Sequence, residues 1–136
     1  MSTTISFQGA NYNIPANGDE QWGTQVSNFL IATGQKLNRK EVTVVATNNG
    51  TLTAPTTTED YIASAATPVT LSASTAITNG SDGQILRIRG SSSTNTVTIL
   101  NGANTTMNGS CILAAGDFIV FKWDALTFWT EVNRSN

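Results

Sequence analysis

The stretch at residues 118–123 reads Phe-Ile-Val-Phe-Lys-Trp and predicts a β-strand. Successive strand residues point to opposite faces of a sheet, so one face would carry three apolar residues and the other would carry Phe118 and Val120. A two-layer sandwich needs only one apolar face per strand. The second apolar face therefore predicts either an interface with another subunit or cover by a helix of the same chain.

Short strands separated by turn residues continue on both sides of this stretch. Asn-Gly pairs at residues 79–80, 101–102 and 108–109 are typical of tight turns that need positive φ. The spacing of strands and turns predicts a mainly β protein, a β-sandwich with a jelly-roll-like organisation. The other strands expected in this module are residues 69–72, 84–89, 96–100, 110–113 and 128–132.

Upstream of this module we predict one further strand, at residues 41–45, followed by an Asn-Asn-Gly turn. Residues 51–58 are rich in Thr and contain a proline, which indicates a linker or a loose edge segment. The chain is thus divided into an N-terminal arm and helix for attachment or oligomerisation (1–40), a strand and linker (41–60), and a β-sandwich module (61–136).

The first 17 residues predict an extended arm. Polar and apolar residues alternate at 4–7 and at 11–14, which is the pattern of half-buried strands. Gly9 lies between the two pieces, and Pro15 ends the second. The two predicted strands form either a small hairpin or an arm that adds to the sheet of a neighbouring subunit.

One amphipathic helix is expected, from residue 19 to about residue 33. Asp19 and Glu20 place negative charge at its N-terminus, where the helix dipole favours it, and Gly34 is placed to end it. Apolar residues recur at i, i+4, i+7 and i+8, so they form one stripe that must pack on an apolar surface. This stripe consists of Trp22, Val26, Phe29 and Leu30.

The composition argues against nucleic-acid and membrane partners. The formal net charge is −2, and no basic block is longer than residues 38–40. Nucleic-acid binders concentrate positive charge to neutralise phosphates, so we expect no nucleic-acid partner. No run approaches the roughly 20 apolar residues that span a bilayer, and no secretory signal is recognisable, so we expect synthesis in a cytosol and no membrane partner.

Side chains suited to catalysis are scarce. The chain has no histidine, which removes imidazole acid–base chemistry and most transition-metal sites. Its single cysteine, Cys111, is expected to be a small buried residue on a strand. The carboxylates lie at a helix start, beside a loop or in turns, and a glycosidase-type carboxylate pair is the remaining enzymatic alternative. We therefore predict no enzyme, no cofactor and no metal.

Trp123 and Trp129 offer the main alternative to a purely structural role. If exposed, their rings could stack on sugars, as could the ring of Tyr61. If the two tryptophans instead alternate inward on adjacent strands of a terminal hairpin, they belong to the core.

Four segments, in this order, resemble a small β module of tailed-bacteriophage structural proteins, which include capsid decoration (cement) proteins, head fibres and tail-fibre tips. They are Asp-Gly-Gln-Ile-Leu-Arg-Ile (82–88), Asn-Thr-Val-Thr-Ile (95–99), Leu-Ala-Ala-Gly-Asp-Phe (113–118) and Trp-Asp-Ala-Leu-Thr-Phe-Trp-Thr-Glu-Val (123–132). The opening of the chain, residues 5–7, 12–15, 22–23 and 26–30, is similar to N-terminal segments of phage virion proteins, including those of podoviruses and cyanophages.

This resemblance implies a capsid decoration or cement protein, assembled in the cytoplasm of a bacterial host and located on the capsid surface of the virion. Such proteins typically form homotrimers, and their partners are the major capsid protein or other virion proteins. A head- or tail-fibre tip that binds host-surface glycan through Trp123 and Trp129 is the alternative, although the chain lacks coiled-coil heptads and shaft repeats. The residues expected to mediate capsid binding and self-association are Ile5, Phe7, Tyr12, Ile14, Trp22, Val26, Phe29, Leu30, Phe118 and Val120.

Overall fold

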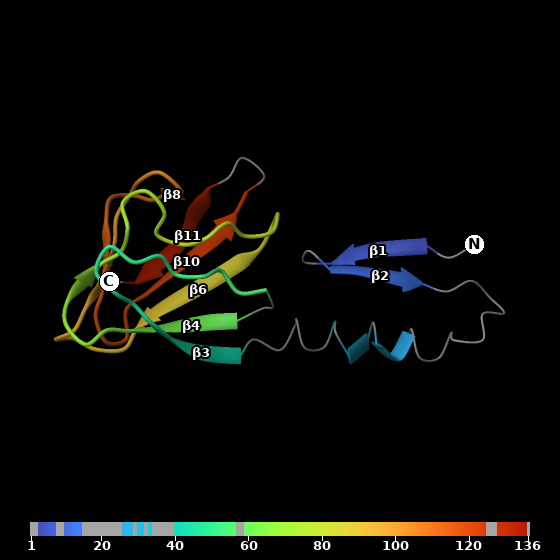
Figure 1. The fold of residues 1–136 in the computed structure, drawn as a ribbon, viewed down its shortest axis with the longest axis horizontal. Coiled ribbons are helices and arrows are strands. Elements are labelled where there is room, and N and C mark those ends of the chain that lie inside the picture. The colour runs from blue at the N-terminus through green and yellow to red at the C-terminus, as the bar shows by residue number, and fades with distance from the viewer. Residues whose placement is uncertain are drawn as a thin grey trace.

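The computed structural model describes residues 3–7, 10–14, 26–28, 30–31, 33, 40–56, 59–124 and 128–135. Figure 1 shows a two-layer β structure formed by the chain from β3 onward, with a separate β-hairpin and a helical segment beside it. The predicted mainly β class is confirmed, and the two sheets make the fold sandwich-like.

The larger sheet has six strands and mixes parallel with antiparallel pairs. β3 pairs parallel with β4, and β4 pairs parallel with β6. The next pairs, β6 with β10 and β10 with β11, are antiparallel, and β11 pairs parallel with β8. In sheet order the strands are β3 (Lys40–Val45), β4 (Glu59–Ser64), β6 (Ile85–Gly90), β10 (Phe118–Trp123), β11 (Trp129–Ser135) and β8 (Thr105–Thr106).

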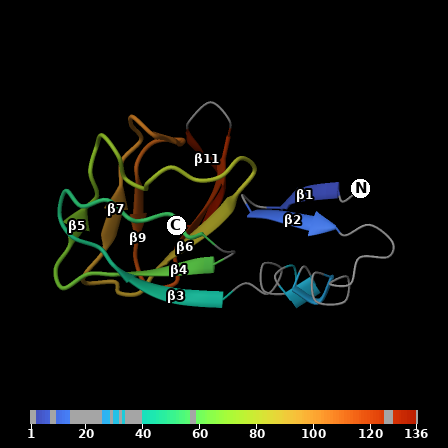
Figure 2. The ribbon, with the colours of Figure 1, turned by 45° about the vertical axis from the view of Figure 1, so that its right-hand side comes forward.

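The smaller sheet forms the second layer, and its strands are labelled in Figure 2. It contains β5 (Val69–Thr70), β7 (Val97–Ile99) and β9 (Cys111–Leu113), in that order. β5 and β7 are parallel, whereas β7 and β9 are antiparallel.

The parallel pairs arise because the chain winds in stacked coils. After β3, β4 and β6 the chain crosses to the opposite layer, and these returning segments hydrogen-bond to one another. Asn49 N donates to Thr70 O at 2.8 Å, and Leu71 N donates to Thr98 O at 2.9 Å. Jelly rolls are built from antiparallel strands, so the jelly-roll-like organisation predicted from the sequence is not confirmed.

The core lies between the two sheets. Leu86 and Ile88 of β6 and Ile119 and Phe121 of β10 are fully buried at alternate positions, as the period of two predicts. Burying each such side chain contributes about 1.5–3 kcal/mol. The other large, fully buried side chains are Trp129, Leu71, Ile77, Ile99 and Leu113.

The described residues of the Thr-rich segment, 51–56, belong to this core, so the prediction of a linker is wrong for them. Leu52 is only 4% exposed, and its N–H donates to Ala76 O at 2.9 Å. The Tyr61 hydroxyl donates to Thr53 O at 2.6 Å. Because β3 also pairs with β4, the β-sandwich begins near residue 40, not at residue 61. The high threonine content does not indicate a buried segment, but Leu52 and Ala54 point inward while Thr51 and Thr53 face solvent.

Glycine is required for different reasons in two of the predicted turns, for its backbone conformation at Gly109 and for close packing at Gly80. Gly109 has φ of 77°, as the Asn-Gly turn predicts. Gly80 is not among the glycines with positive φ. Instead, a Cβ at Gly80 would lie 2.7 Å from Cζ2 of Trp129, so glycine is needed there for close packing.

β4 and β8 are not predicted from the sequence. β4 reads Glu-Asp-Tyr-Ile-Ala-Ser, so only Tyr61 and Ile62 have the aromatic or β-branched side chains that indicate a strand. β8 has only two residues and lies among turn-forming residues. Both pair with strands that are distant in sequence, which no local pattern reveals.

The N-terminal elements lie apart from the two sheets. β1 (Thr3–Phe7) and β2 (Ala10–Ile14) form the predicted hairpin, with Ile5 opposite Tyr12. The backbone is helical at residues 26–28, 30–31 and 33. Leu30 is 61% exposed, so the predicted burial of the helix stripe is wrong at this residue. Figures 1 and 2 place the helical segment beyond the N-terminal end of β3 and not across β10.

Candidate interaction surface

The six-stranded sheet packs one face on the core, and its opposite face, called the outer face below, carries the alternate residues of the same strands. The register aligns Ile62, Arg89 and Phe118 in one row across β4, β6 and β10, and Arg87 and Val120 in the next. The described residues of the outer face are Glu41, Thr43, Val45, Asp60, Ile62, Ser64, Ile85, Arg87, Arg89, Phe118, Val120, Lys122, Thr130, Asn133 and Ser135, together with Val132, which the register shift leaves without a partner on β10.

Apolar side chains are concentrated on the central strands of the outer face. Ile62, Ile85, Phe118 and Val120 are only partly buried there, although all four lie on strands with neighbours on both sides. Val132 of β11 is 60% exposed. In the register these apolar side chains alternate with charged ones, since Arg89 lies between Ile62 and Phe118. Partly exposed apolar side chains grouped on one sheet face beside charges are typical of protein–protein interfaces.

Four charged residues of the outer face form two ion pairs. Arg89 Nη2 lies 3.2 Å from Glu41 Oε1, and Arg87 Nη1 lies 3.8 Å from Asp60 Oδ2. The Arg87 guanidinium also lies over the ring of Phe118, 5.0 Å from its centroid, in a cation–π contact. Partly exposed ion pairs contribute only about 0–1 kcal/mol. Their main effect here is to neutralise charge beside the apolar side chains.

Arg89 adds a polar group that lacks a partner. Its Nε atom is buried and has no hydrogen-bond acceptor in the described structure. Buried donors are nearly always paired in proteins. The Arg89 side chain is 38% exposed as a whole, so the outer part of its guanidinium, and not the buried Nε, is what a second molecule on the outer face would contact.

Four of the described carboxylates, in addition to Glu41, are engaged in structural contacts. Asp117 Oδ2 accepts a hydrogen bond from Ala114 N at 3.0 Å, which closes the turn before β10. Asp124 accepts one from a threonine of β11 at 3.1 Å. Asp60 and Glu131 each face an arginine. Within the described ranges, no group of three or more His, Cys, Asp or Glu residues could hold a metal ion.

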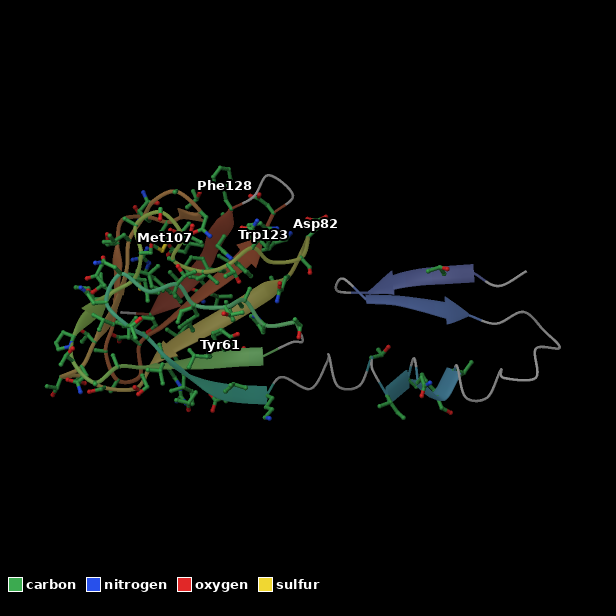
Figure 3. All side chains as sticks on the ribbon, in the orientation of Figure 1. Tyr61, Asp82, Met107, Trp123 and Phe128 are labelled. Atoms are coloured by element: carbon green, nitrogen blue, oxygen red, sulfur yellow. The ribbon has the colours of Figure 1, made fainter. Side chains whose placement is uncertain are left out.

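Trp123 and Trp129 are core residues. Trp123 is 5% exposed and Trp129 is 0% exposed, and their rings pack edge to face with centroids 5.3 Å apart. Trp129 Nε1 also donates to Thr78 O at 2.9 Å. The inward alternative from the sequence therefore describes both residues, and neither ring is available to stack on a sugar, as the glycan-contact hypothesis requires. Figure 3 shows Trp123 at its place on the sandwich and Phe128 near the rim.

The predicted association residues fall on different parts of the molecule. Phe118 and Val120 lie on the outer face, as expected. Val26 is partly buried and Leu30 exposed on the helical segment, while Trp22 and Phe29 lie outside the described residues. The β1–β2 register places four others on one face of the hairpin, namely Ile5, Phe7, Tyr12 and Ile14.

Ile62 and Val132 also lie on the outer face, but they are not among the association residues predicted from the sequence. A reading of residues 59–64 with a period of two places Ile62 opposite the buried Tyr61, so the signal is present. A period of two counted from the buried Trp129 also places Val132 outward. The ladder between β10 and β11 shifts register after Val120, so the alternation along β11 is reversed only beyond Val132.

Arg134 and Glu131 link β11 to the turn that precedes β9. Arg134 Nε donates to Glu131 Oε1 at 2.6 Å, and Arg134 Nη1 donates to Ser110 O at 3.2 Å. Nη2 of the same arginine donates to the main-chain oxygen of Asn108 at 3.1 Å, and Asn108 N in turn donates to Glu131 Oε2 at 2.9 Å. These contacts tie β11 to the turn before β9. They also lower the pKa of Glu131 below its ordinary value of 4.5, mainly through the hydrogen bond from Arg134.

Replacing Glu131 with glutamine is expected to reduce the free energy of unfolding at pH 7 by about 1–2 kcal/mol, because hydrogen bonds to charged groups contribute about 1.5–3 kcal/mol and glutamine retains part of the geometry. The folded-state pKa is depressed, so this stabilisation is present above pH 4.5 and is lost as the pH falls below it. Urea denaturation from pH 7 to pH 3 should show the difference between wild type and variant shrinking on acidification. A difference that is constant over this range would show that the carboxylate charge is not responsible.

Cys111 is fully buried on β9, as predicted. Burial raises the pKa of its thiol, and the nearby Arg134 acts in the opposite direction but more weakly. A neutral, buried thiol is unreactive, so Cys111 is a packing residue.

Comparison with known proteins found no matching family model, no similar curated protein and no similar solved structure. In the part of the chain that the structure describes, no helix is long and apolar enough to cross a bilayer.

Proposed function

We propose that this chain is a structural protein of a tailed-bacteriophage virion, and specifically a capsid decoration or cement protein on the outer head surface. The observation that carries the proposal is the outer face, where apolar side chains on central strands lie beside charges that are already paired. The resemblance of residues 82–88, 95–99, 113–118 and 123–132 to phage β modules supplies the virion context. The major capsid protein or another virion protein is the partner, and the assembled unit is a homotrimer.

The mechanism is burial of surface between neighbouring subunits of the shell. A stable interface buries about 800 Å² on each partner, and apolar area removed from water contributes about 25 cal/mol per Å² before the costs of association. Contacts made to two adjacent capsid subunits at once would resist their separation under internal pressure. No reaction is part of this role.

The proposal is tested with heads of the encoding phage that were assembled without this protein. Purified wild-type protein is expected to bind them saturably and to raise the temperature at which they lose DNA. Val120→Arg places a second positive charge beside Arg87 on the central strands of the outer face and is expected to weaken binding at least tenfold, since desolvating an unpaired charge is costly. Binding, stoichiometry and DNA release are measured by sedimentation and by dye fluorescence.

Ile112→Arg is the matched control, because Ile112 is an exposed apolar residue on β9 of the other sheet. This variant should bind like wild type. If Val120→Arg also binds like wild type, the outer face is not the contact surface. If wild-type protein does not bind heads at all, the decoration role is wrong.

A head- or tail-fibre tip that binds host glycan is the alternative, but its proposed contacts are unsuitable. Trp123, Trp129 and Tyr61 are all buried, and the Tyr61 hydroxyl is engaged with Thr53 O. Phe128 is an exposed aromatic residue, but it is not one of the predicted sugar contacts. No residue-level observation therefore favours glycan binding over capsid binding.

A further inference from the structure

The outer edge of β3 is open. β3 pairs with β4 on one side, and within the described residues no strand pairs with it on the other. Sheet edges are usually protected by charges, prolines, bulges or a covering segment. In β3 the only charged residues are Lys40 and Glu41 at its beginning, and residues 42–45 read Val-Thr-Val-Val without a proline.

The hydrogen bonds between β3 and β4 show which main-chain groups of β3 point toward β4 and which point away from it. Ala46 N, just after β3, donates to Ser64 O of β4 at 2.7 Å. Main-chain groups of successive strand residues point alternately to the two sides. The N–H and C=O groups of Val42 and Val44 therefore point toward β4, and those of Thr43 and Val45 point away from it, into the open edge.

The core is also incompletely covered at this edge. Val42 and Val44 point inward and pack against the core, but both are only partly buried. Val45, at the end of the strand, is 74% exposed. An added strand beside β3 would cover these side chains and satisfy the free main-chain groups together.

The β1–β2 hairpin would in turn be stabilised by a neighbouring strand. It is a two-stranded sheet that pairs with no third strand among the described residues, and an isolated two-stranded hairpin is at best marginally stable in water. Its register places Ile5, Phe7, Tyr12 and Ile14 on one face. Residues 3–14 carry no charge, and each strand has five residues against the six of β3.

We propose that the β1–β2 hairpin of one copy adds to the open edge of β3 in a second copy. The added strand extends the six-stranded sheet, and the apolar face of the hairpin lies beside Val42 and Val44 on the same side of that sheet, where the core is incomplete. Main-chain hydrogen bonds supply affinity in this mode of recognition, and the inward side chains supply register. Within one copy the hairpin lies beyond the end of the sandwich and not along its own β3 in either view, which leaves the edge free (Figures 1 and 2). The inference concerns contacts between copies and does not depend on the capsid.

Thr43→Pro in the full-length chain tests the edge directly. Proline removes only the N–H that points into the open edge, a position that edge strands tolerate, and so leaves the hydrogen bonds between β3 and β4 intact. By light scattering, wild type is expected to be a multiple of 14.4 kDa and Thr43→Pro to be a monomer of 14.4 kDa. Thr43→Val keeps the N–H and should have the mass of wild type.

A pair of double variants tests the hairpin independently of β3. Ile5→Ser with Tyr12→Ser changes an opposed pair on the apolar face, and Thr4→Ser with Asn13→Ser changes an opposed pair on the other face. The first should give the monomer mass and the second the wild-type mass. Circular dichroism and thermal melting establish that each variant is folded.

Three results would overturn the inference. They are a wild-type monomer at all concentrations, a folded Thr43→Pro variant with the wild-type mass, and equal masses for the two hairpin double variants. A wild-type monomer would mean that the hairpin folds onto its own β3 or onto nothing. If the masses follow the prediction but heads are not bound, self-association stands and the proposed capsid role fails.

Discussion

Trp129→Ala is expected to lower the free energy of unfolding by about 3–5 kcal/mol, the usual cost of truncating a buried tryptophan. Trp129 is fully buried on β11, where its ring packs edge to face on Trp123 and Phe121. Its Nε1 donates to Thr78 O at 2.9 Å, and its ring fills the space beside Gly80. The substitution thus removes a central part of the core and leaves a buried carbonyl without its partner. Urea denaturation followed by circular dichroism measures the change.

Two further variants separate the contributions of Trp129. Trp129→Phe keeps an aromatic ring but loses the indole N–H, so its destabilisation should be intermediate. Phe128→Ala changes the neighbouring, exposed aromatic residue and should cost less than about 1 kcal/mol, as is usual for surface positions. If Trp129→Ala costs no more than Phe128→Ala, then Trp129 is not a core residue and the glycan hypothesis regains one of its two contacts.

Asn104→Ala is expected to cost about 2–5 kcal/mol, because it leaves two buried main-chain groups unpaired and each such group costs about 1–3 kcal/mol. The side chain of Asn104 is buried between returning segments of the stacked coils. Its Oδ1 accepts from Ala76 N at 3.1 Å, and its Nδ2 donates to Ile77 O. The side-chain amide therefore continues the hydrogen bonding between coils at a place where no strand does so.

The control for this prediction is Asn133→Ala, because Asn133 is exposed on β11. Its effect should stay within about 0.5 kcal/mol. The comparison uses denaturant midpoints and slopes, so that a change in cooperativity is recognised. Equal destabilisation by the two variants would show that Asn104 does not join the coils.

Local patterns predict the strands well where side chains alternate strongly. Residues 118–123 form β10 as predicted, and the neighbouring strands are found within a few residues of their expected positions. In these segments the period of two and the bounding turns are both encoded in adjacent residues. The same pattern correctly gives two different faces of β10, one in the core and one on the outer face.

The stacking of coils could not be predicted in this way. β3 pairs with β4, and β4 pairs with β6, in each case across a long intervening segment. The register of these pairs therefore depends on how the intervening segments return through the second layer. Leu52 and Asn104 determine that return, but each lies in a Thr- and Asn-rich stretch that resembles a linker or a turn. Whether such a residue is buried is decided by tertiary contacts and not by its neighbours in sequence.

The candidate surface was predictable only in part. Two apolar faces on β10 indicate an interface, and Phe118 and Val120 are correctly placed on it. The alternation of Trp123 and Trp129 indicates either exposure or burial, and only the opposing sheet decides between them. The open edge of β3 is invisible in the sequence, because it depends on which strands fail to pair with it.

A density map of the virion of the encoding phage tests the central claim most directly. We expect three β-sandwiches, one homotrimer, at each attachment position on the outside of the head, with the outer face of β4, β6 and β10 turned toward neighbouring subunits. Heads that lack the protein, or copies whose outer face points into solvent with no protein against it, would contradict the account.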